Sequence, residues 1–185
     1  MRVITGSARA VKLFSPQGLT VRPTSERVKE AVFSIIQFDI ESRKVLDLFA
    51  GSGQMGIEAL SRGASHAVFI DTNPDSINTV KANLKKTKLA DKASVLSGEA
   101  LSYLKSSQEF FDIAFVDPPY NDGIYIDTLA LLVKRMNKGG TILCEAPYKE
   151  ELPKTVEDFT LIKEYHYSHT KIALYRTQIL QGVMF

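Results

Sequence analysis

The sequence contains a single cysteine, Cys144, among its 185 residues. One cysteine cannot form a disulfide within the chain, and it excludes a cysteine-rich zinc site. Cys144 lies in the apolar run 141–144, where we expect a small buried side chain and not a reactive thiol. The histidines show no metal-binding spacing with acidic or cysteine partners, so no metal site is expected.

The sequence also lacks a long hydrophobic run and a strong excess of charge. No run approaches the roughly 18–20 apolar residues that a membrane span needs, and residues 1–6 lack a signal-peptide core. We therefore expect a cytoplasmic protein without membrane contact. The net charge is only +2, so any surface that binds nucleic acid has to be a local patch.

The composition and pattern of the chain fit one globular domain. Hydrophobic residues make up 44% of the sequence, enough for a full core. From residue 44 onward, apolar runs alternate with amphipathic stretches. We predict strands at residues 45–49, 67–70, 93–96, 111–116 and 141–146. We predict helices at residues 54–62, 74–89, 101–104 and 125–136, the last of them ended by Gly139 and Gly140.

This alternation predicts an α/β fold with a mostly parallel sheet that is covered by helices on both faces. Residues 160–169 and 171–177 are two strand-like runs with almost no spacer, which predict an antiparallel pair at the sheet edge. The sheet would then have seven strands. Ligands bind such sheets beyond the carboxyl ends of the strands, near the point where the strand order reverses.

Residues 1–40 have a different pattern from residues 41–185. Residues 3–4 and 11–14 suggest a small β hairpin, and residues 28–36 carry apolar side chains at helical spacing. We interpret this segment as an N-terminal extension of the same domain. In residues 1–30, basic side chains clearly outnumber the two acidic ones, Glu26 and Glu30. The basic residues are Arg2, Arg9, Lys12, Arg22, Arg27 and Lys29.

The first predicted strand runs into a glycine-rich loop. Residues 50–56 read Ala-Gly-Ser-Gly-Gln-Met-Gly, which is a G-x-G-x-x-G pattern between a strand and a helix. Such a loop lets a ligand approach the backbone closely. By itself the pattern is also typical of dinucleotide-binding folds.

Acidic residues at the strand ends narrow the choice of ligand. Asp47 lies in the strand before the glycines, and Asp71 ends the next strand, where a carboxylate can bind the two hydroxyls of a ribose. Glu99 follows the third strand and could reach an adenine. S-adenosylmethionine fits acidic residues at these positions. It has no phosphate, so the loop does not need to bind an anion, and it carries an amino group that a carboxylate can meet. The predicted cofactor contacts are Asp47, Phe49, Gly51, Ser52, Gly53, Asp71, Thr72, Glu99 and Ala100.

Each of the carboxylates also has a simpler interpretation. Asp71 could be a solvated side chain beside a helix, and Asp47 could serve a capping or turn role at the strand end. Glu99 could simply open a helix, since negative charge is favourable at that end of the helix dipole.

Residues 117–120 read Asp-Pro-Pro-Tyr and follow the apolar strand 111–116. The prolines make a rigid turn and have no N–H to compete for the acceptors, which are Asp117 and the carbonyl of Pro118. A nucleobase amino group could donate one hydrogen to each acceptor while the base stacks on Tyr120. We therefore predict an amino-methylation site made of Asp117, Pro118, Pro119 and Tyr120. The alternative is an ordinary strand-ending turn.

Together, residues 47–53 (Asp-Leu-Phe-Ala-Gly-Ser-Gly), Asp71 and residues 117–120 resemble class I S-adenosylmethionine-dependent methyltransferases that act on exocyclic amino groups. More closely, the chain resembles the bacterial RsmD-type methyltransferases, which modify guanine N2 in small-subunit ribosomal RNA. The likeness spans nearly the whole chain. It includes residues 2–6 (Arg-Val-Ile-Thr-Gly) and residues 22–30 (Arg-Pro-Thr-Ser-Glu-Arg-Val-Lys-Glu), which resemble the N-terminal signature of that family.

The resemblance implies a Rossmann-like class I methyltransferase fold and transfer of a methyl group from S-adenosylmethionine to N2 of one guanine in 16S ribosomal RNA. The substrate would be the RNA within an assembling or assembled small subunit, and we expect the enzyme to be a monomer. Arg9, Lys12, Arg22 and Arg27 are the predicted RNA contacts, with a merely solvated surface as the alternative.

Other functions stay open at this point. Adenine-N6 or cytosine-N4 methylation of DNA would use a similar motif, but Asp117 stands where those enzymes more commonly have Asn, and no separate target-recognition domain is evident. A nicotinamide-dependent oxidoreductase would use the glycine loop but leaves residues 117–120 unexplained. A non-enzymatic RNA-binding protein could have kept the scaffold. Titration with S-adenosylmethionine and NAD, followed by a methyl-transfer assay on ribosomal RNA, distinguishes these functions.

Overall fold

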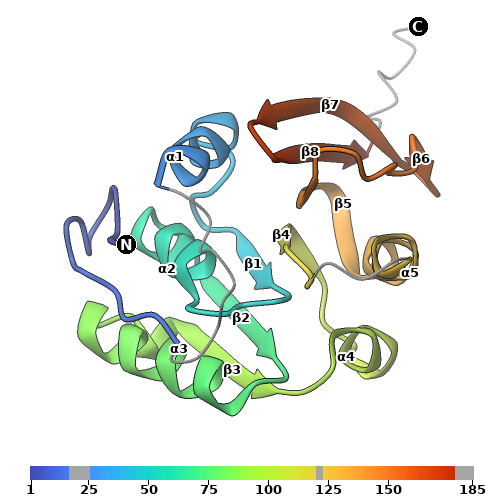
Figure 1. Cartoon of the computed structure of the whole chain (residues 1–185). Coiled ribbons are helices and arrows are strands. Elements are labelled where there is room, and N and C mark those ends of the chain that lie inside the picture. Colours follow the sequence, from blue (N-terminus) through green and yellow to red (C-terminus); the bar gives the residue numbers. More distant parts are fainter. Residues whose placement is uncertain (17–25, 120–122, 178–185) are drawn as a thin grey trace, which may run out of the picture.

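A computed structural model describes residues 1–16, 26–119 and 123–177 (Figure 1). The strands are β1 (Lys44–Asp47), β2 (His66–Asp71), β3 (Ala93–Ser97), β4 (Phe111–Val116), β5 (Met136–Pro147), β6 (Thr155–Val156), β7 (Phe159–Tyr167) and β8 (Thr170–Thr177). The α-helices are α1 (Glu26–Ile35), α2 (Gln54–Ser61), α3 (Pro74–Thr87), α4 (Ala100–Ser106) and α5 (Ile124–Leu132). Within these described ranges, no helix is long and apolar enough to span a membrane.

All the strands belong to one 8-stranded sheet with the order β3-β2-β1-β4-β5-β8-β7-β6. Strands β1 to β5 run parallel, while β8 pairs antiparallel with both β5 and β7. The predicted α/β class, with a mostly parallel sheet and an antiparallel C-terminal pair, is confirmed. The short strand β6 pairs with β7 and adds an eighth strand to the seven that the sequence predicted.

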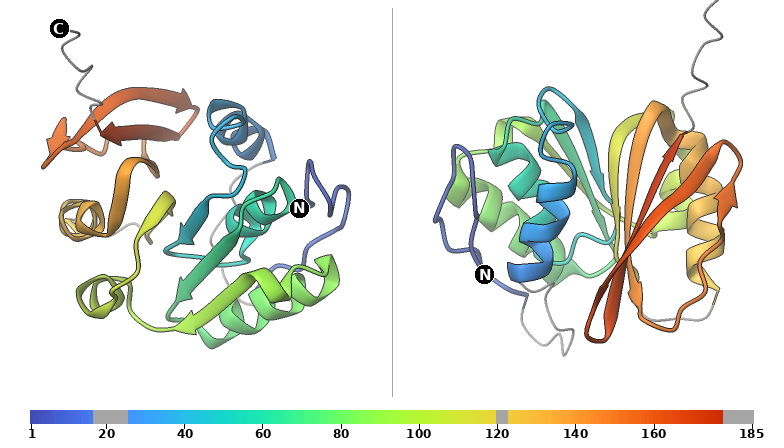
Figure 2. Two further views of the ribbon diagram at one scale, coloured as in Figure 1. Left: turned by 180° about the vertical axis from the view of Figure 1, so that it is seen from behind. Right: turned by 90° about the horizontal axis from the view of Figure 1, so that it is seen from above.

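Helices cover both faces of the sheet (Figure 2). Helices α1, α2 and α3 pack on one face through a core cluster that includes Phe33, Ile57 and Val80. Helices α4 and α5 pack on the other face through a second cluster that includes Leu104 and Leu129. Strands that are buried on both faces have nearly continuous apolar sequences, which is why these segments could be recognised from the sequence.

The junction between α5 and β5 differs from the prediction. Helix α5 ends at Leu132, and a short 3-10 turn, Val133–Arg135, leads directly into β5. Gly139 and Gly140 therefore lie inside β5, where the pairing with β4 shifts register. Gly139 has a φ of 82°, which glycine adopts without a steric penalty. The two glycines thus mark an irregularity in a strand and not the end of a helix.

Residues 1–16 lie beside α2 and α3 (Figure 1). An isolated antiparallel bridge between Arg2 and Lys12 takes the place of the predicted hairpin strands. Val3 and Leu13 belong to the same core cluster as α1 and α2. This packing supports the proposal that the N-terminal extension is part of the same domain.

A buried group of charges attaches the N-terminal segment to the helices. The carboxylate of Glu58 in α2 accepts hydrogen bonds from the N–H groups of Ile4 (2.7 Å) and Thr5 (3.0 Å). It also accepts one from Nε of Arg62 at 2.8 Å, and Nζ of Lys29 lies 3.4 Å away. Burial lowers the pKa of Lys29, while the neighbouring Glu58 acts in the opposite direction. Lys29 is therefore a core residue and not part of the basic surface.

Candidate active site

The predicted site residues meet at one edge of the sheet. β1 ends with Asp47, β2 ends with Asp71, and Asp117 follows β4 directly. The glycine-rich loop connects β1 to α2 at the same edge. The strand order reverses here, because β2 and β3 lie on one side of β1 while β4 and β5 lie on the other. Ligands of doubly wound sheets bind at such a point.

Asp71 holds the glycine-rich loop in place. One of its carboxylate oxygens accepts a hydrogen bond from the N–H of Gly51 at 2.8 Å, and the other accepts one from the N–H of Asn73 at 2.8 Å. An ionised carboxylate has about four lone-pair sites. Asp71 can therefore still accept hydrogen bonds from two ribose hydroxyls while it supports the loop.

Asp47 is buried beneath the loop. Its carboxylate accepts a hydrogen bond from the N–H of Gly56, in the first turn of α2, at 2.9 Å. Burial raises the pKa of Asp47 to about 7; the hydrogen bond from Gly56 opposes this shift, and the negative charge of Asp71 adds to it. Asp47 therefore caps the first turn of α2, which was the simpler of the two interpretations of this residue. A cationic amino group close to Asp47 would favour its ionised form.

Glycine is required at two positions of the loop for different structural reasons. A Cβ atom at Gly56 would lie 2.3 Å from the ring of Phe69 in β2, so this glycine lets α2 pack closely on the sheet. A Cβ atom at Gly51 would meet nothing within 4 Å. The backbone of Gly51 is therefore the part of the loop that a ligand can approach.

Replacing Gly56 with alanine is expected to lower the free energy of unfolding by about 1–3 kcal/mol, the usual cost of overpacking a core. Gly98→Ala is the matched control, because a Cβ atom there would meet nothing within 4 Å and Gly98 does not have the positive φ that would strain an alanine at Gly51. That variant should be nearly as stable as the wild type. Urea denaturation of both variants measures the effect, and equal losses of stability would contradict the packing role of Gly56.

Glu99 and Ala100 lie where α4 begins. The Glu99 carboxylate accepts hydrogen bonds from the N–H groups of Leu101 (3.1 Å) and Ser102 (2.7 Å). The Ser102 hydroxyl also donates to it, and this bond is the main reason why the pKa of Glu99 is lowered. Glu99 therefore caps the start of α4, as its simpler interpretation predicted. A contact between Glu99 and adenine stays a prediction. Ala100 is buried in the second core cluster.

The remaining predicted cofactor residues surround the loop. Thr72 is exposed directly after Asp71. Phe49 is partly buried against the second core cluster, and Gly53 precedes α2 with a φ of 74°. The Ser52 hydroxyl lies 3.3 Å from the sulfur of Met1, so it is directed toward the N-terminal segment.

A small pocket opens beside Asp117. It has a volume of about 20 Å³ and is lined by Val32, Met55, Phe115, Val116, Asp117, Leu143, Glu145 and Ile172. These residues come from α1, α2, β4, β5 and β8. After Asp117, Pro118 is buried and Pro119 is exposed, while Tyr120 lies outside the described residues. The predicted catalytic turn therefore borders a pocket whose lining is largely apolar.

The carboxyl group of Asp117 is in an environment that disfavours its charge. Asp117 is exposed at the rim of the pocket, although protein atoms crowd closely around its carboxyl group. This burial, followed by the negative charges of Glu145 and Asp47, raises the pKa of Asp117 well above its usual value. Such perturbed carboxylates are common at functional sites.

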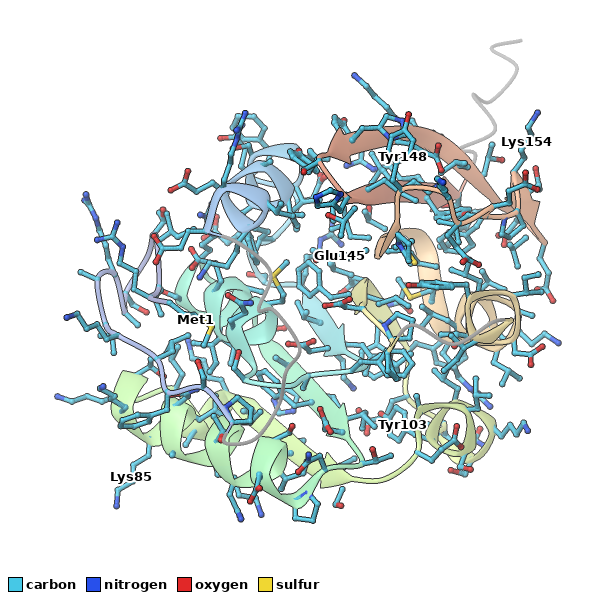
Figure 3. All side chains as sticks on the ribbon, in the orientation of Figure 1. Met1, Lys85, Tyr103, Glu145, Tyr148 and Lys154 are labelled. Carbon is cyan, nitrogen blue, oxygen red and sulfur yellow. The ribbon has the colours of Figure 1, made fainter. Side chains whose placement is uncertain are left out.

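Glu145 is the site residue that the sequence did not reveal. Figure 3 shows it near the middle of the molecule, whereas Lys85 and Lys154 project from the periphery. Its sequence signal was available: Glu145 is the only charged residue within the apolar run 141–146. A charge inside an otherwise buried strand is unusual unless it has a specific partner or role.

None of the predicted RNA contacts belongs to the described lining of this pocket. Arg9, Lys12 and Arg27 are exposed, the first two in the N-terminal segment and the third on α1. Arg22 lies outside the described residues. In the part of the chain that the structure describes, no three His, Cys, Asp or Glu side chains are grouped so that they could hold a metal ion.

The fold of this protein is that of the class I methyltransferases. A family model described as "Conserved hypothetical protein 95" matches residues 1–176, and the chain belongs to that family. The resemblance to the RsmD type of methyltransferase is thereby confirmed.

Similar proteins are known from several bacteria. The Bacillus subtilis protein "Putative rRNA methyltransferase YlbH" is 38% identical over 181 residues, which cover 95% of this chain and 98% of the relative. "Ribosomal RNA small subunit methyltransferase D" of Escherichia coli K12 is 34% identical, with 89% and 83% covered. The solved structure of "Putative methyltransferase yhhF" from Escherichia coli has a TM-score of 0.87 and 34% identity, covering 96% of this chain and 97% of that one.

Proposed function

We propose that this protein transfers a methyl group from S-adenosylmethionine to the exocyclic N2 amino group of a guanine in small-subunit ribosomal RNA. S-adenosylmethionine is the methyl donor, as it is for other enzymes with this fold. The observation that carries the proposal is the position of Asp117 and Pro118, which follow β4 beside the pocket and share an edge of the sheet with the glycine-rich loop. The similarity to ribosomal RNA methyltransferases supports RNA as the substrate.

The residues of the loop fit the methyl donor. Gly51 leaves open space beside its backbone, and Asp71 has acceptor capacity for a ribose. Asp47 would meet the amino group of the donor, and its carboxylate also accepts a hydrogen bond from the N–H of Gly56. When bound, S-adenosylmethionine supplies an electrophilic methyl group on a sulfonium.

The chain's own residues would prepare the guanine amino group for reaction. This nitrogen is a poor nucleophile, because its lone pair is delocalised into the ring. Asp117 and the carbonyl of Pro118 would each accept one of its hydrogens and favour a pyramidal nitrogen with a localised lone pair. The methyl donor would supply the carbon for the new N–C bond, and Asp117 would accept the released proton directly or through water. Alignment and electrostatics at a fixed site supply most of the rate enhancement.

The target guanine has to leave its stack to reach this turn. An unpaired guanine in a loop is cheaper to expose than a paired one. Tyr120 would stack on the extruded base and contribute roughly 1–3 kcal/mol, the usual range for contacts between bases and aromatic side chains. We further propose that the substrate is RNA within an assembling or assembled small subunit and that the enzyme acts as a monomer.

The test of this function is a comparison of ribosomal RNA from cells with and without the protein. Mass mapping should find one guanine that carries an N2 methyl group only when the protein is present. Purified protein with S-adenosylmethionine should restore that methyl group on small subunits from the deletion strain, while NAD and duplex DNA should give no product. Ribosomal RNA with the same guanine methylation in both strains would refute the proposal.

Removal of positive charge from the exposed basic residues should weaken RNA binding without affecting chemistry at Asp117. We expect the triple variant Arg9→Ala, Lys12→Ala, Arg27→Ala to lower RNA affinity and to flatten the dependence of affinity on salt, because fewer counterions are released. Filter binding at a series of salt concentrations measures both. Lys154→Ala is a control on the periphery of the molecule, and an unchanged salt slope in the triple variant would favour a merely solvated surface.

A further inference from the structure

Glu145 shares the pocket beside Asp117 and is not explained by the methyl transfer itself. It lies in β5 and pairs with Ile172 of β8. Successive side chains of a strand point to opposite faces, so Glu145 is on the same face as Leu143, two residues earlier. Leu143, Glu145 and Ile172 all line the pocket. Asp117 lines the same pocket, and the negative charge of Glu145 contributes to its raised pKa.

The shape of the pocket suits the edge of a base. Its walls are apolar and include Val32, Met55, Phe115 and Ile172, and Asp117 and Glu145 are the charged side chains of its described lining. The volume of about 20 Å³ is close to the space that one water molecule needs. A pocket of that size would admit only the edge of a base, whose rings would lie outside, at the turn that follows β4.

The charges of the pocket favour one base over the others. An ionised carboxylate can only accept hydrogen bonds. The Watson–Crick edge of guanine presents the N1–H beside the two N–H bonds of the N2 amino group, which makes three adjacent donors. Adenine and cytosine present a ring nitrogen acceptor beside their amino group, and that acceptor would face a carboxylate unfavourably. Two neighbouring carboxylates therefore complement guanine and reject the other two amino-bearing bases.

We propose that Glu145 is the residue that selects guanine, by accepting a hydrogen bond from its N1–H while Asp117 and the Pro118 carbonyl bind the N2 amino group. This inference rests on the proposed function and adds a role that the methyl transfer does not require. The three donors of guanine stabilise both negative charges when the base is bound, which offsets the repulsion between the carboxylates in the free enzyme. Specificity then arises as much from rejection of a ring acceptor as from attraction of a donor.

The test compares guanine with 2-aminopurine, which keeps the N2 amino group but has no hydrogen on N1. Small subunits are reconstituted with ribosomal RNA that carries one or the other base at the mapped target position. The wild-type enzyme should prefer guanine in kcat/KM by roughly 10- to 100-fold, the range of one good hydrogen-bonded contact to a base edge. In Glu145→Met, which has similar volume but no strong acceptor, the ratio should fall toward 1. Glu145→Gln should also lose much of the preference, because its amide can present the oxygen to the N1–H of guanine or the NH2 group to the N1 acceptor of 2-aminopurine.

Controls separate this role from folding and from the chemistry. Thermal melting and S-adenosylmethionine affinity should be unchanged in both variants, and Glu145→Ala serves as the acceptor-free variant if methionine disturbs the fold. Glu151→Ala removes an exposed carboxylate from the following loop and should keep the wild-type ratio. A wild-type ratio in the acceptor-free variants would overturn the role of Glu145 alone. If wild-type enzyme methylated no guanine in these subunits, the proposed function itself would be refuted.

Discussion

Asp117→Ala is expected to lower kcat/KM for methyl transfer by roughly 10²–10³-fold, while the affinity for S-adenosylmethionine stays near its wild-type value. The magnitude is that of removing one preorganised group that stabilises the transition state. Cofactor affinity should survive because the glycine-rich loop is held by Asp71 and Asp47, which lie at the ends of other strands. Single-turnover kinetics on small subunits and calorimetric titration of the cofactor measure the two quantities.

Asp117→Asn separates the two tasks assigned to Asp117. Asparagine keeps an oxygen that accepts a hydrogen bond but cannot take up the released proton. A loss as large as that of Asp117→Ala would identify proton transfer as the main contribution, whereas a small loss would identify orientation of the amino group. Unchanged turnover in both variants would remove Asp117 from the mechanism.

The raised pKa of Asp117 also determines the direction of the pH dependence. The reaction needs the ionised carboxylate, and burial and neighbouring charges shift its ionisation toward higher pH. The wild-type rate should therefore rise with pH beyond the range in which an ordinary aspartate is already fully ionised. In Asp117→Asn this limb of the pH–rate profile should disappear.

The second large effect is expected in stability. Glu58→Ala should lower the free energy of unfolding by about 3–5 kcal/mol, the usual cost of removing one partner from a buried ion pair. The substitution leaves Lys29 buried without its counter-charge and takes the acceptor away from the N–H groups of Ile4 and Thr5. Urea denaturation monitored by circular dichroism measures the change.

A surface ion pair supplies the matched control. Lys134 pairs with Glu157 at 3.7 Å, and both side chains are more than half exposed, so Lys134→Ala should cost less than about 1 kcal/mol. Lys29→Met added to Glu58→Ala should recover part of the lost stability, because no uncompensated charge is then buried. Equal losses in Glu58→Ala and Lys134→Ala would show that the buried group contributes no more than a surface pair.

Much of the fold could be predicted because its signals are local. Strand β4 was predicted with its observed boundaries, Phe111–Val116, from a mostly apolar run followed closely by two prolines. Helix α3 was predicted from Pro74, where it begins, and from apolar side chains at helical spacing. The error at Gly139 and Gly140 has a local cause as well: glycine pairs end helices and also mark irregular strands, and pairing with β4 decides between the two.

The candidate site could be predicted only in part. Asp47, Asp71 and Asp117 stand at strand ends, and the parallel arrangement of those strands already implied that they share an edge. The contacts between residues of the site could not be predicted from the sequence. That Asp47 binds the Gly56 N–H and Asp71 binds the Gly51 N–H depends on how the loop folds over the strands.

The amino-acid sequence by itself determined the order of strands and helices, the glycine-rich loop and the rigid turn at Asp117, because glycine, proline and apolar periodicity act over a few neighbouring residues. Only the tertiary structure decided that Glu145 stands beside Asp117 and that Lys29 is buried against Glu58. Both pairs join segments that are far apart in the chain. Their proximity follows from strand order and helix packing, which no local pattern specifies.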